Sequence, residues 1–336
     1  MSITVSSAEL RHGAVEAAEA IHVRIPFRRP VATAAGLWTE CDSWIVRQRR
    51  ADGSVSFGEG RTPESAAVFE WPSSVAGRSV AVNAFLGAGP LDEIVAQAGA
   101  AVAAGFETLK MKVGTERSTA ELAARVGAVR AAIGPNTRLR LDANGAWDAD
   151  DAPGNLRAVA EHGIEFVEQP ITAGSGVAAG SGAVAEPAAT AAFAEALATL
   201  RAESPVAIAA DESVTSVEAA RALIEARAAD VLVVKPARVG GPDAAVAIAS
   251  LASAAGIAVV ISTFFETGVG IAVALAVAAT LPVGPAHGLA TADLLESDLL
   301  VRPIAIARGR MIVPAGIELN ETALDRYAVE RSGRWT

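Results

Sequence analysis

From residue 81 onward the chain alternates short apolar segments with longer alanine-rich ones, and this repetition restricts its fold more than any other feature. Eight of the apolar segments have the length and composition of buried strands: residues 81–86, 108–113, 138–142, 165–168, 206–211, 231–235, 257–263 and 286–290. Segments of helical character lie between them, at residues 91–104, 119–133, 155–162, 217–228 and 242–255. Eight strands with helical crossovers predict an α/β fold of the TIM-like (β/α) barrel type. A doubly wound open sheet is the competing architecture, but the polar residues gathered at the strand ends favour a closed barrel.

The first 80 residues have a different texture. Strand-like pieces that fit a hairpin meander occur at residues 19–25, 44–50 and 55–58. Residues 62–75 have the composition of a helix. We therefore expect residues 1–80 to form a small α+β capping domain and residues 81–300 to form the barrel.

Two further segments qualify this division. A strand pair is predicted around residues 314–316, and part of residues 301–336 is expected to return to the capping domain. Residues 171–190 are rich in Gly, Ala and Ser and carry one charge, Glu186, which predicts a flexible insertion after the fourth strand. The helix that follows this insertion is expected to begin near Ala191.

Composition excludes several classes of partner. The chain of 336 residues is 51% hydrophobic and 20% charged, as in compact globular proteins, and its net charge is -10. This charge argues against nucleic acid or an anionic membrane as the main partner, and it requires a locally positive pocket for any anionic substrate. The single cysteine, Cys41, excludes an intrachain disulfide, and the N-terminal sequence lacks the pattern of a signal peptide, so a cytoplasmic protein is expected. Nothing in the sequence indicates an oligomeric state.

Three consecutive strands end in a carboxylate: Asp142 follows the third, Glu168 the fourth and Asp211 the fifth. The carboxyl ends of barrel strands converge on one face, so these side chains should lie next to one another. Adjacent carboxylates repel, and a hard divalent cation with oxygen ligands relieves that repulsion. The pattern predicts a metal site, with Mg²⁺ as the preferred ion.

Lysines stand at the same level on strands two and six. Lys110 and Lys112 share one side of strand two, and Lys235 ends strand six, half the barrel circumference away. Lys112 and Lys235 should face each other across the metal. We expect the neighbouring positive charges to lower a lysine pKa, which would make a neutral amine available as a base. These groups suit abstraction of a proton next to a metal-bound carboxylate.

The strand-end motifs resemble those of the enolase superfamily, in its muconate-lactonising subgroup. They are Lys110-Met111-Lys112, Asp142-Ala143-Asn144, Glu168-Gln169-Pro170, Asp211-Glu212-Ser213 and Lys235-Pro236. The resemblance implies a barrel with a capping domain and a magnesium ion held by Asp142, Glu168 and Asp211. It implies that Lys112 takes a proton and returns it to a departing hydroxyl, while Lys235 stays protonated and stabilises negative charge. Lys110 would support the substrate carboxylate and the base.

The resemblance leaves the reaction open between two kinds of enzyme. One is a lyase that dehydrates a cyclohexadiene carboxylate, for which proton transfer on one face suffices. The other is a racemase of N-succinylamino acids or a dipeptide epimerase, which needs both lysines. The eighth strand favours the lyase, because residues 286–299 lack the Asp-x-Asp pattern that dipeptide epimerases place there.

Several other residues are predicted to contact the substrate. They are Arg140 and Asn144 beside the first carboxylate, and Ser262 and Thr263 at the end of the seventh strand. The helix start at residues 268–270 is a second candidate holder for a substrate carboxylate, through its free N–H groups. In the capping domain, Arg28 and Arg29 with Leu37 and Trp38 are expected to close over the site.

Overall fold

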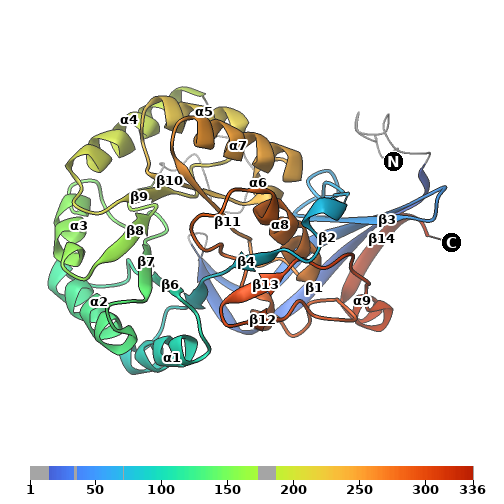
Figure 1. Ribbon diagram of the computed structural model, residues 1–336, viewed down its shortest axis with the longest axis horizontal. Coiled ribbons are helices and arrows are strands. Elements are labelled where there is room, and N and C mark those ends of the chain that lie inside the picture. Colours follow the sequence, from blue (N-terminus) through green and yellow to red (C-terminus); the bar gives the residue numbers. More distant parts are fainter. Residues whose placement is uncertain (1–14, 34–35, 71, 173–186, 336) are drawn as a thin grey trace.

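The computed structural model describes residues 15–33, 36–70, 72–172 and 187–335. A parallel sheet of seven strands curls into a barrel with helices on its outside, and a long antiparallel sheet lies next to it (Figure 1). The barrel strands pair in sequence order: β5 (Ala84–Leu86), β6 (Thr108–Lys112), β7 (Arg138–Asp142), β8 (Ile164–Glu168), β9 (Ile208–Ala210), β10 (Val231–Val234) and β11 (Ala258–Ile261). The predicted fold class is confirmed.

The eighth position of the barrel is filled by residues 286–288 rather than by a full strand. These residues form two isolated parallel bridges, Val82 with His287 and Ser262 with Gly288. The seam has one unusual hydrogen bond, because the N–H of Ile261 donates to Nδ1 of the His287 side chain at 2.9 Å. The prediction of a continuous strand over residues 286–290 is therefore wrong, since a side chain takes the place of a ladder carbonyl here.

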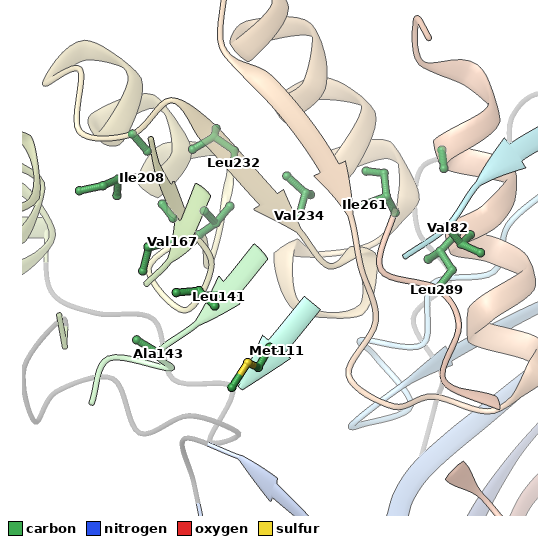
Figure 2. Close-up of a cluster of buried hydrophobic side chains, with 14 of the residues drawn as sticks. Val82, Met111, Leu141, Ala143, Val167, Ile208, Leu232, Val234, Ile261 and Leu289 are labelled. Atoms are coloured by element: carbon green, nitrogen blue, oxygen red, sulfur yellow. The ribbon is translucent and has the colours of Figure 1, made fainter. Parts of the chain in front are cut away.

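Alternation along the barrel strands separates two layers. Met111, Leu141, Val167, Leu232 and Ile261 are buried in the main core, between the strands and the surrounding helices (Figure 2). Because successive side chains of a strand point to opposite faces, the residues between them point into the barrel. Its interior holds the small apolar cluster of Phe166, Ala209, Val231, Val233 and Val260. The same inward face leads to the carboxyl ends of the strands.

Helices follow most of the barrel strands. They are α1 (Leu91–Ala103), α2 (Thr119–Ile133), α3 (Ala152–Ala160), α4 (Pro187–Glu203), α5 (Val217–Glu225), α6 (Pro236–Val239), α7 (Pro242–Ala254) and α8 (Gly268–Thr280). Ser118 and Ser216 cap α2 and α5 by accepting from the N–H groups of Glu121 and Ala219. In α8 nearly every residue is buried, which explains its uniformly apolar sequence. No helix in the described part of the chain is long and apolar enough to cross a membrane.

The antiparallel sheet combines segments from both ends of the chain. Its order is β14 (Ala328–Arg334), β1 (Val15–Thr33), β2 (Gly36–Arg50) and β3 (Val55–Gly60). Its buried face shares a second core with Leu295, Leu299 and Leu324, the last of which lies on α9 (Glu321–Tyr327). A three-stranded sheet of β12 (Ile306–Ala307), β13 (Arg310–Ile312) and β4 (Ser79–Ala81) lies at the barrel's edge. The division into domains at residue 80 stays a prediction.

Residues 62–75 do not form the predicted helix in their described part. Thr62 and Ser65 instead bond each other's backbone through their hydroxyls, with Ser65 N–H donating to Thr62 Oγ1 and Thr62 N–H to Ser65 Oγ. Such local bonds compete with helical ones. Phe69 then bridges to Phe57 of β3, and a short 3₁₀ helix covers Ser73–Val75.

Two other boundaries differ from expectation. The C-terminal strand pair turns at Arg308-Gly309 rather than around residues 314–316. Both turn residues have positive φ, 52° and 66°, as a two-residue hairpin requires, and an arginine is an uncommon residue there. Helix α4 begins at Pro187 rather than near Ala191, since proline suits the first turn of a helix. Most of the predicted insertion, residues 173–186, lies outside the described residues.

Candidate active site at the carboxyl ends of the strands

The structure brings the three predicted carboxylates together. Asp142 and Glu168 end β7 and β8 and are direct partners in the parallel register, and Asp211 follows β9 immediately. Lys112, at the end of β6, pairs in register with Asp142. All three carboxylate side chains are almost fully buried.

The turns after β7 and β8 fix these carboxylates. Asn144 and Gln169 both have positive φ, 47° and 41°, which turns the chain sharply after each strand. Asn144 N–H donates to Asp142 Oδ1 at 3.0 Å. Gln169 Oε1 accepts from the N–H groups of Asp211 at 3.0 Å and Ser213 at 3.3 Å. Sequence reasoning missed this role of Gln169, and its place beside Glu168 was the available signal.

Lys110 lies among the carboxylates. Its Nζ is 2.9 Å from Asp142 Oδ2 and 2.5 Å from Glu168 Oε1. Burial alone would lower the pKa of the Lys110 ammonium, but Asp142 and Glu168 hold it well above its usual range. The group is therefore a fixed positive charge.

The carboxylates themselves are perturbed in opposite directions. Burial would raise the pKa of Asp142, yet Lys110 and Lys112 keep it below its usual value. Burial, together with Asp142 and Asp211, raises the pKa of Glu168 well above its usual value in spite of Lys110. Glu168 is buried beside two other carboxylates and shares the Lys110 ammonium with Asp142, which favours a proton on Glu168.

Lys112 and Lys235 both line a pocket at this end of the barrel. Lys112 Nζ donates to Asn144 Oδ1 and lies 3.8 Å from Asp142 Oδ2. Lys235 Nζ is paired more tightly, at 2.6 Å from Asp211 Oδ2. Burial would lower the pKa of Lys235, but Asp211 and Glu212 raise it. The pKa of Lys235 is thus raised, like that of Lys110, because each is paired with a carboxylate. A lysine pKa lowered by a bound cation stays a prediction.

The carboxylates have the right chemistry for a hard divalent cation. Their donors are all carboxylate oxygens, and Asp211 Oδ1 is buried without a hydrogen-bond partner. Within the described residues, however, no group of three or more carboxylate, histidine or cysteine side chains has an arrangement that could hold a metal ion. The ammonium of Lys110 lies where two of them meet, so binding of a cation requires Lys110 to withdraw from at least one carboxylate.

Four of the five predicted substrate contacts lie at the pocket. Lys110, Asn144, Ser262 and Thr263 line it. Thr263 Oγ1 is also bonded to Thr291 Oγ1 at 3.2 Å. A residue missed from the sequence, Glu212, lines the pocket too and accepts from Asn144 Nδ2 at 2.9 Å. Its signal was its position directly after Asp211.

The fifth predicted contact, Arg140, does not line the pocket. It is almost completely buried inside the barrel, where its Nε donates to Glu165 Oε2 at 2.6 Å and its Nη1 donates to Ala286 O at 2.6 Å. Its guanidinium also lies 4.7 Å from the ring centre of Phe166. These contacts tie β7 to β8 and to the short eighth segment.

The predicted carboxylate holder at the start of α8 is already occupied by a protein side chain. Glu59 of β3 accepts from Thr267 N–H at 3.0 Å, from Thr267 Oγ1 at 2.6 Å and from Gly270 N–H at 2.8 Å. A helix N-terminus favours negative charge, and here Glu59 supplies it. A substrate carboxylate must be held elsewhere.

The capping sheet contributes to the pocket through one of its predicted residues. Trp38 lines the pocket beside Phe264 and Phe265, two aromatic residues that the sequence did not single out. Arg28 and Arg29 do not line it, and they contact Glu296 O and Glu93 instead.

Comparisons with known proteins agree with this architecture. The family described as "Enolase C-terminal domain-like" matches residues 93–181 and 182–323. Two solved structures share the fold: an N-succinyl Arg/Lys racemase from Bacillus cereus and a muconate lactonizing enzyme from Pseudomonas fluorescens. The first has a TM-score of 0.79 at 20% identity over 96% of this chain and 100% of that one. The second has a TM-score of 0.77 at 24% identity over 94% and 99%.

Two actinobacterial relatives are closer in sequence, and both are named o-succinylbenzoate synthase. The protein from Thermobifida fusca is 38% identical over 270 residues, which cover 79% of this chain and 75% of that one. The protein from Mycobacterium tuberculosis is 35% identical over 212 residues, which cover 62% and 57%.

The barrel, the capping sheet and the strand-end site define an enzyme with the enolase-superfamily fold. The chain belongs to that superfamily and, within it, to the family of the o-succinylbenzoate synthases. Enzymes of this superfamily generally use a divalent metal.

Proposed function

We propose that the protein is a magnesium-dependent lyase that dehydrates 2-succinyl-6-hydroxy-2,4-cyclohexadiene-1-carboxylate to o-succinylbenzoate, a step of menaquinone biosynthesis. One observation carries the proposal: Lys112 and Lys235 line the same pocket as Asp142, the first of the three carboxylates. The names of the two relatives support the choice of reaction.

The pocket suits a substrate with two carboxylates. Four basic side chains line it in a protein of net charge -10: Lys110, Lys112, Lys235 and Arg238. Their charge attracts and orients an anionic substrate. A Mg²⁺ ion held by Asp142, Glu168 and Asp211 would supply further positive charge to stabilise the negative charge that develops on the substrate carboxylate.

Lys112 is the proposed base. It is held less closely by a carboxylate than Lys235, at 3.8 Å against 2.6 Å, so its Nζ is the freer of the two to approach the substrate. Its bond to Asn144 Oδ1 fixes one N–H and leaves the lone pair free to face the substrate. The amine removes the proton from the ring carbon that bears the carboxylate. The resulting ammonium then gives that proton to the hydroxyl leaving the adjacent carbon, so that water departs and the ring becomes aromatic.

Lys235 is the proposed electrostatic partner. Its ion pair with Asp211 and the Phe264 ring, 4.5 Å from its Nζ, both favour the ammonium form. A fixed ammonium stabilises the developing negative charge without exchanging a proton. This asymmetry between the two lysines favours dehydration, which uses one base.

A racemase of N-succinylamino acids is the second candidate, since both lysines are present and the Bacillus cereus racemase shares the fold. The test is to offer the purified protein with Mg²⁺ the cyclohexadiene and, separately, N-succinylamino acids. We expect loss of the cyclohexadiene absorbance and no loss of optical activity. Racemisation without dehydration would reverse the assignment.

A further inference from the structure

The loop after β11 builds an aromatic wall on the pocket. The Phe264 ring lies 4.5 Å from Lys235 Nζ and stacks on Trp38 of β2, with 6.5 Å between ring centres. The Phe265 ring packs edge-on against Phe27 of β1 and Phe85 of β5, at 5.9 and 5.8 Å. The wall therefore joins the barrel, the capping sheet and Lys235, one of the three lysines that line the pocket.

This wall depends on a strained backbone. Phe265 has φ 62°, in the left-handed region, which is unfavourable for a bulky side chain. Such a conformation costs about 1–3 kcal/mol and persists only when its surroundings impose it. The surroundings here include Glu266, which is almost fully buried and whose carboxylate accepts from the N–H of Phe264. The side chain reaches back two residues and closes the turn that presents the Phe264 ring.

Glu266 stands at the seam between barrel and cap. A Cβ placed on Gly270 would lie 2.5 Å from Glu266 Cβ and 3.0 Å from Glu59 Oε2, so the two glutamates flank the same glycine. Both line a small cavity behind Ser262 and Thr263. Glu59 is the carboxylate from β3 that caps α8.

The charge around Glu266 is unbalanced. The titratable groups that face it come from the cap: Glu59, Arg61 and the buried thiol of Cys41. Burial, followed by the negative charge of Glu59, raises the pKa of Glu266 to about 7, and Arg61 offsets this only in part. Ionisation of Glu266 would place a second negative charge in the seam and loosen its packing.

We propose that Glu266 is a positioning residue for the pocket: by holding the backbone of Phe264 it places the aromatic wall against Trp38 and over Lys235. The inference rests on the proposed function in one respect, that the wall contacts the cyclohexadiene substrate and its product. It predicts that the charge state of a residue outside the pocket affects substrate binding.

Two variants test the proposal. Glu266→Gln keeps an acceptor oxygen and cannot ionise, whereas Glu266→Met has similar length and no acceptor. With Mg²⁺ present, we expect Glu266→Met to raise both the Kd for o-succinylbenzoate and the KM for the cyclohexadiene by about tenfold, which corresponds to ~1.4 kcal/mol. The kcat of this variant should stay within about threefold of wild type. Glu266→Gln should stay within about threefold of wild type at pH 6. Above pH 7 the wild-type Kd should rise relative to that of Glu266→Gln.

A measurement without substrate separates the inference from the proposed function. Amide hydrogen exchange over residues 262–267 should accelerate in Glu266→Met and stay slow in Glu266→Gln. The control is Asp298→Asn, because Asp298 also bonds an amide two residues away, that of Leu300 at 3.1 Å, and does not line the pocket. It should change neither Kd nor exchange in residues 262–267.

The outcomes are distinct. If Glu266→Met lowers the melting temperature but leaves Kd, KM and the exchange of residues 262–267 unchanged, Glu266 is merely structural and the inference is overturned. If wild type neither dehydrates the cyclohexadiene nor binds o-succinylbenzoate, the proposed function fails. In that case the hydrogen-exchange rates of residues 262–267 still test whether Glu266 positions the loop.

Discussion

The histidine in the barrel seam predicts a specific loss of stability in acid. His287 Nδ1 accepts the N–H of Ile261 at 2.9 Å and must be neutral to do so. Burial, with a smaller contribution from Arg140, lowers the pKa of His287 to about 4 from its ordinary value of 6.5. Between pH 6.5 and pH 4, His287 is protonated in the unfolded chain but stays neutral in the folded protein. The free energy of unfolding therefore decreases as the pH falls through this range. A difference of about 2.5 units at ~1.4 kcal/mol per unit amounts to ~3 kcal/mol.

Two substitutions isolate this contribution. His287→Asn keeps an acceptor near the position of Nδ1 but cannot take up a proton, while His287→Leu leaves the N–H of Ile261 unpaired and should cost about 1–3 kcal/mol at pH 7.5. Urea unfolding is measured for each protein in the same buffers from pH 7.5 to pH 4, so that the other titrating groups cancel in the difference.

We expect the difference in free energy of unfolding between wild type and His287→Asn to depend on pH. The stability of wild type relative to His287→Asn should fall by about 3 kcal/mol between pH 6.5 and 4, and level off below that range. Parallel stability curves for the two proteins over the whole range would show that His287 is not held neutral by the fold, and would refute the argument.

Three other predictions concern the site and its surroundings. Lys112→Ala should lower kcat by about 10²–10⁴-fold, within the range for loss of a general base, with an unchanged melting temperature; near-normal turnover would remove Lys112 as the base. Gly270→Ala should destabilise the protein by about 1–3 kcal/mol, because the new Cβ would lie 2.5 Å from Glu266 Cβ. Gly154→Ala in α3 has open space around the new Cβ and should stabilise the protein by about 0.5–1 kcal/mol. Urea unfolding of the two variants should show these opposite changes. Chelation of divalent cations should abolish turnover. The Lys110→Met variant should bind Mg²⁺ at least about tenfold more tightly than wild type by calorimetry, because no ammonium competes with the cation for the carboxylates. Equal or weaker binding by the variant would contradict this competition.

The barrel was predictable because its signal is repetitive. Each strand is a short apolar run followed by a helix, and packing on both faces leaves little choice of structure for a segment such as residues 231–234. Predictions failed where one local interaction decides the conformation. The hydroxyl bonds of Thr62 and Ser65 replaced a helix, and the side chain of His287 replaced a strand.

The site shows the same division. Strand alternation places Lys112, Asp142 and Glu168 on one face at neighbouring positions, so their convergence follows from the sequence. The sequence does not specify the distances between the lysine Nζ atoms and the carboxylate oxygens. Lys235 lies 2.6 Å from a carboxylate oxygen and Lys112 lies 3.8 Å from one, and such distances depend on turns such as the one at Asn144.

The antiparallel sheet has a consequence for how the protein is made. Its outer strand β14 pairs with β1, so the first and last described strands of the chain are neighbours. Synthesis proceeds from the N-terminus, so β1 can pair with β2 early, but about 300 further residues are made before β14 can pair with its other edge. The barrel, whose strands pair in order of synthesis, can assemble during that interval. Assembly of the four-stranded sheet is thus tied to completion of residue 334, and a truncated chain carries an open strand edge on β1.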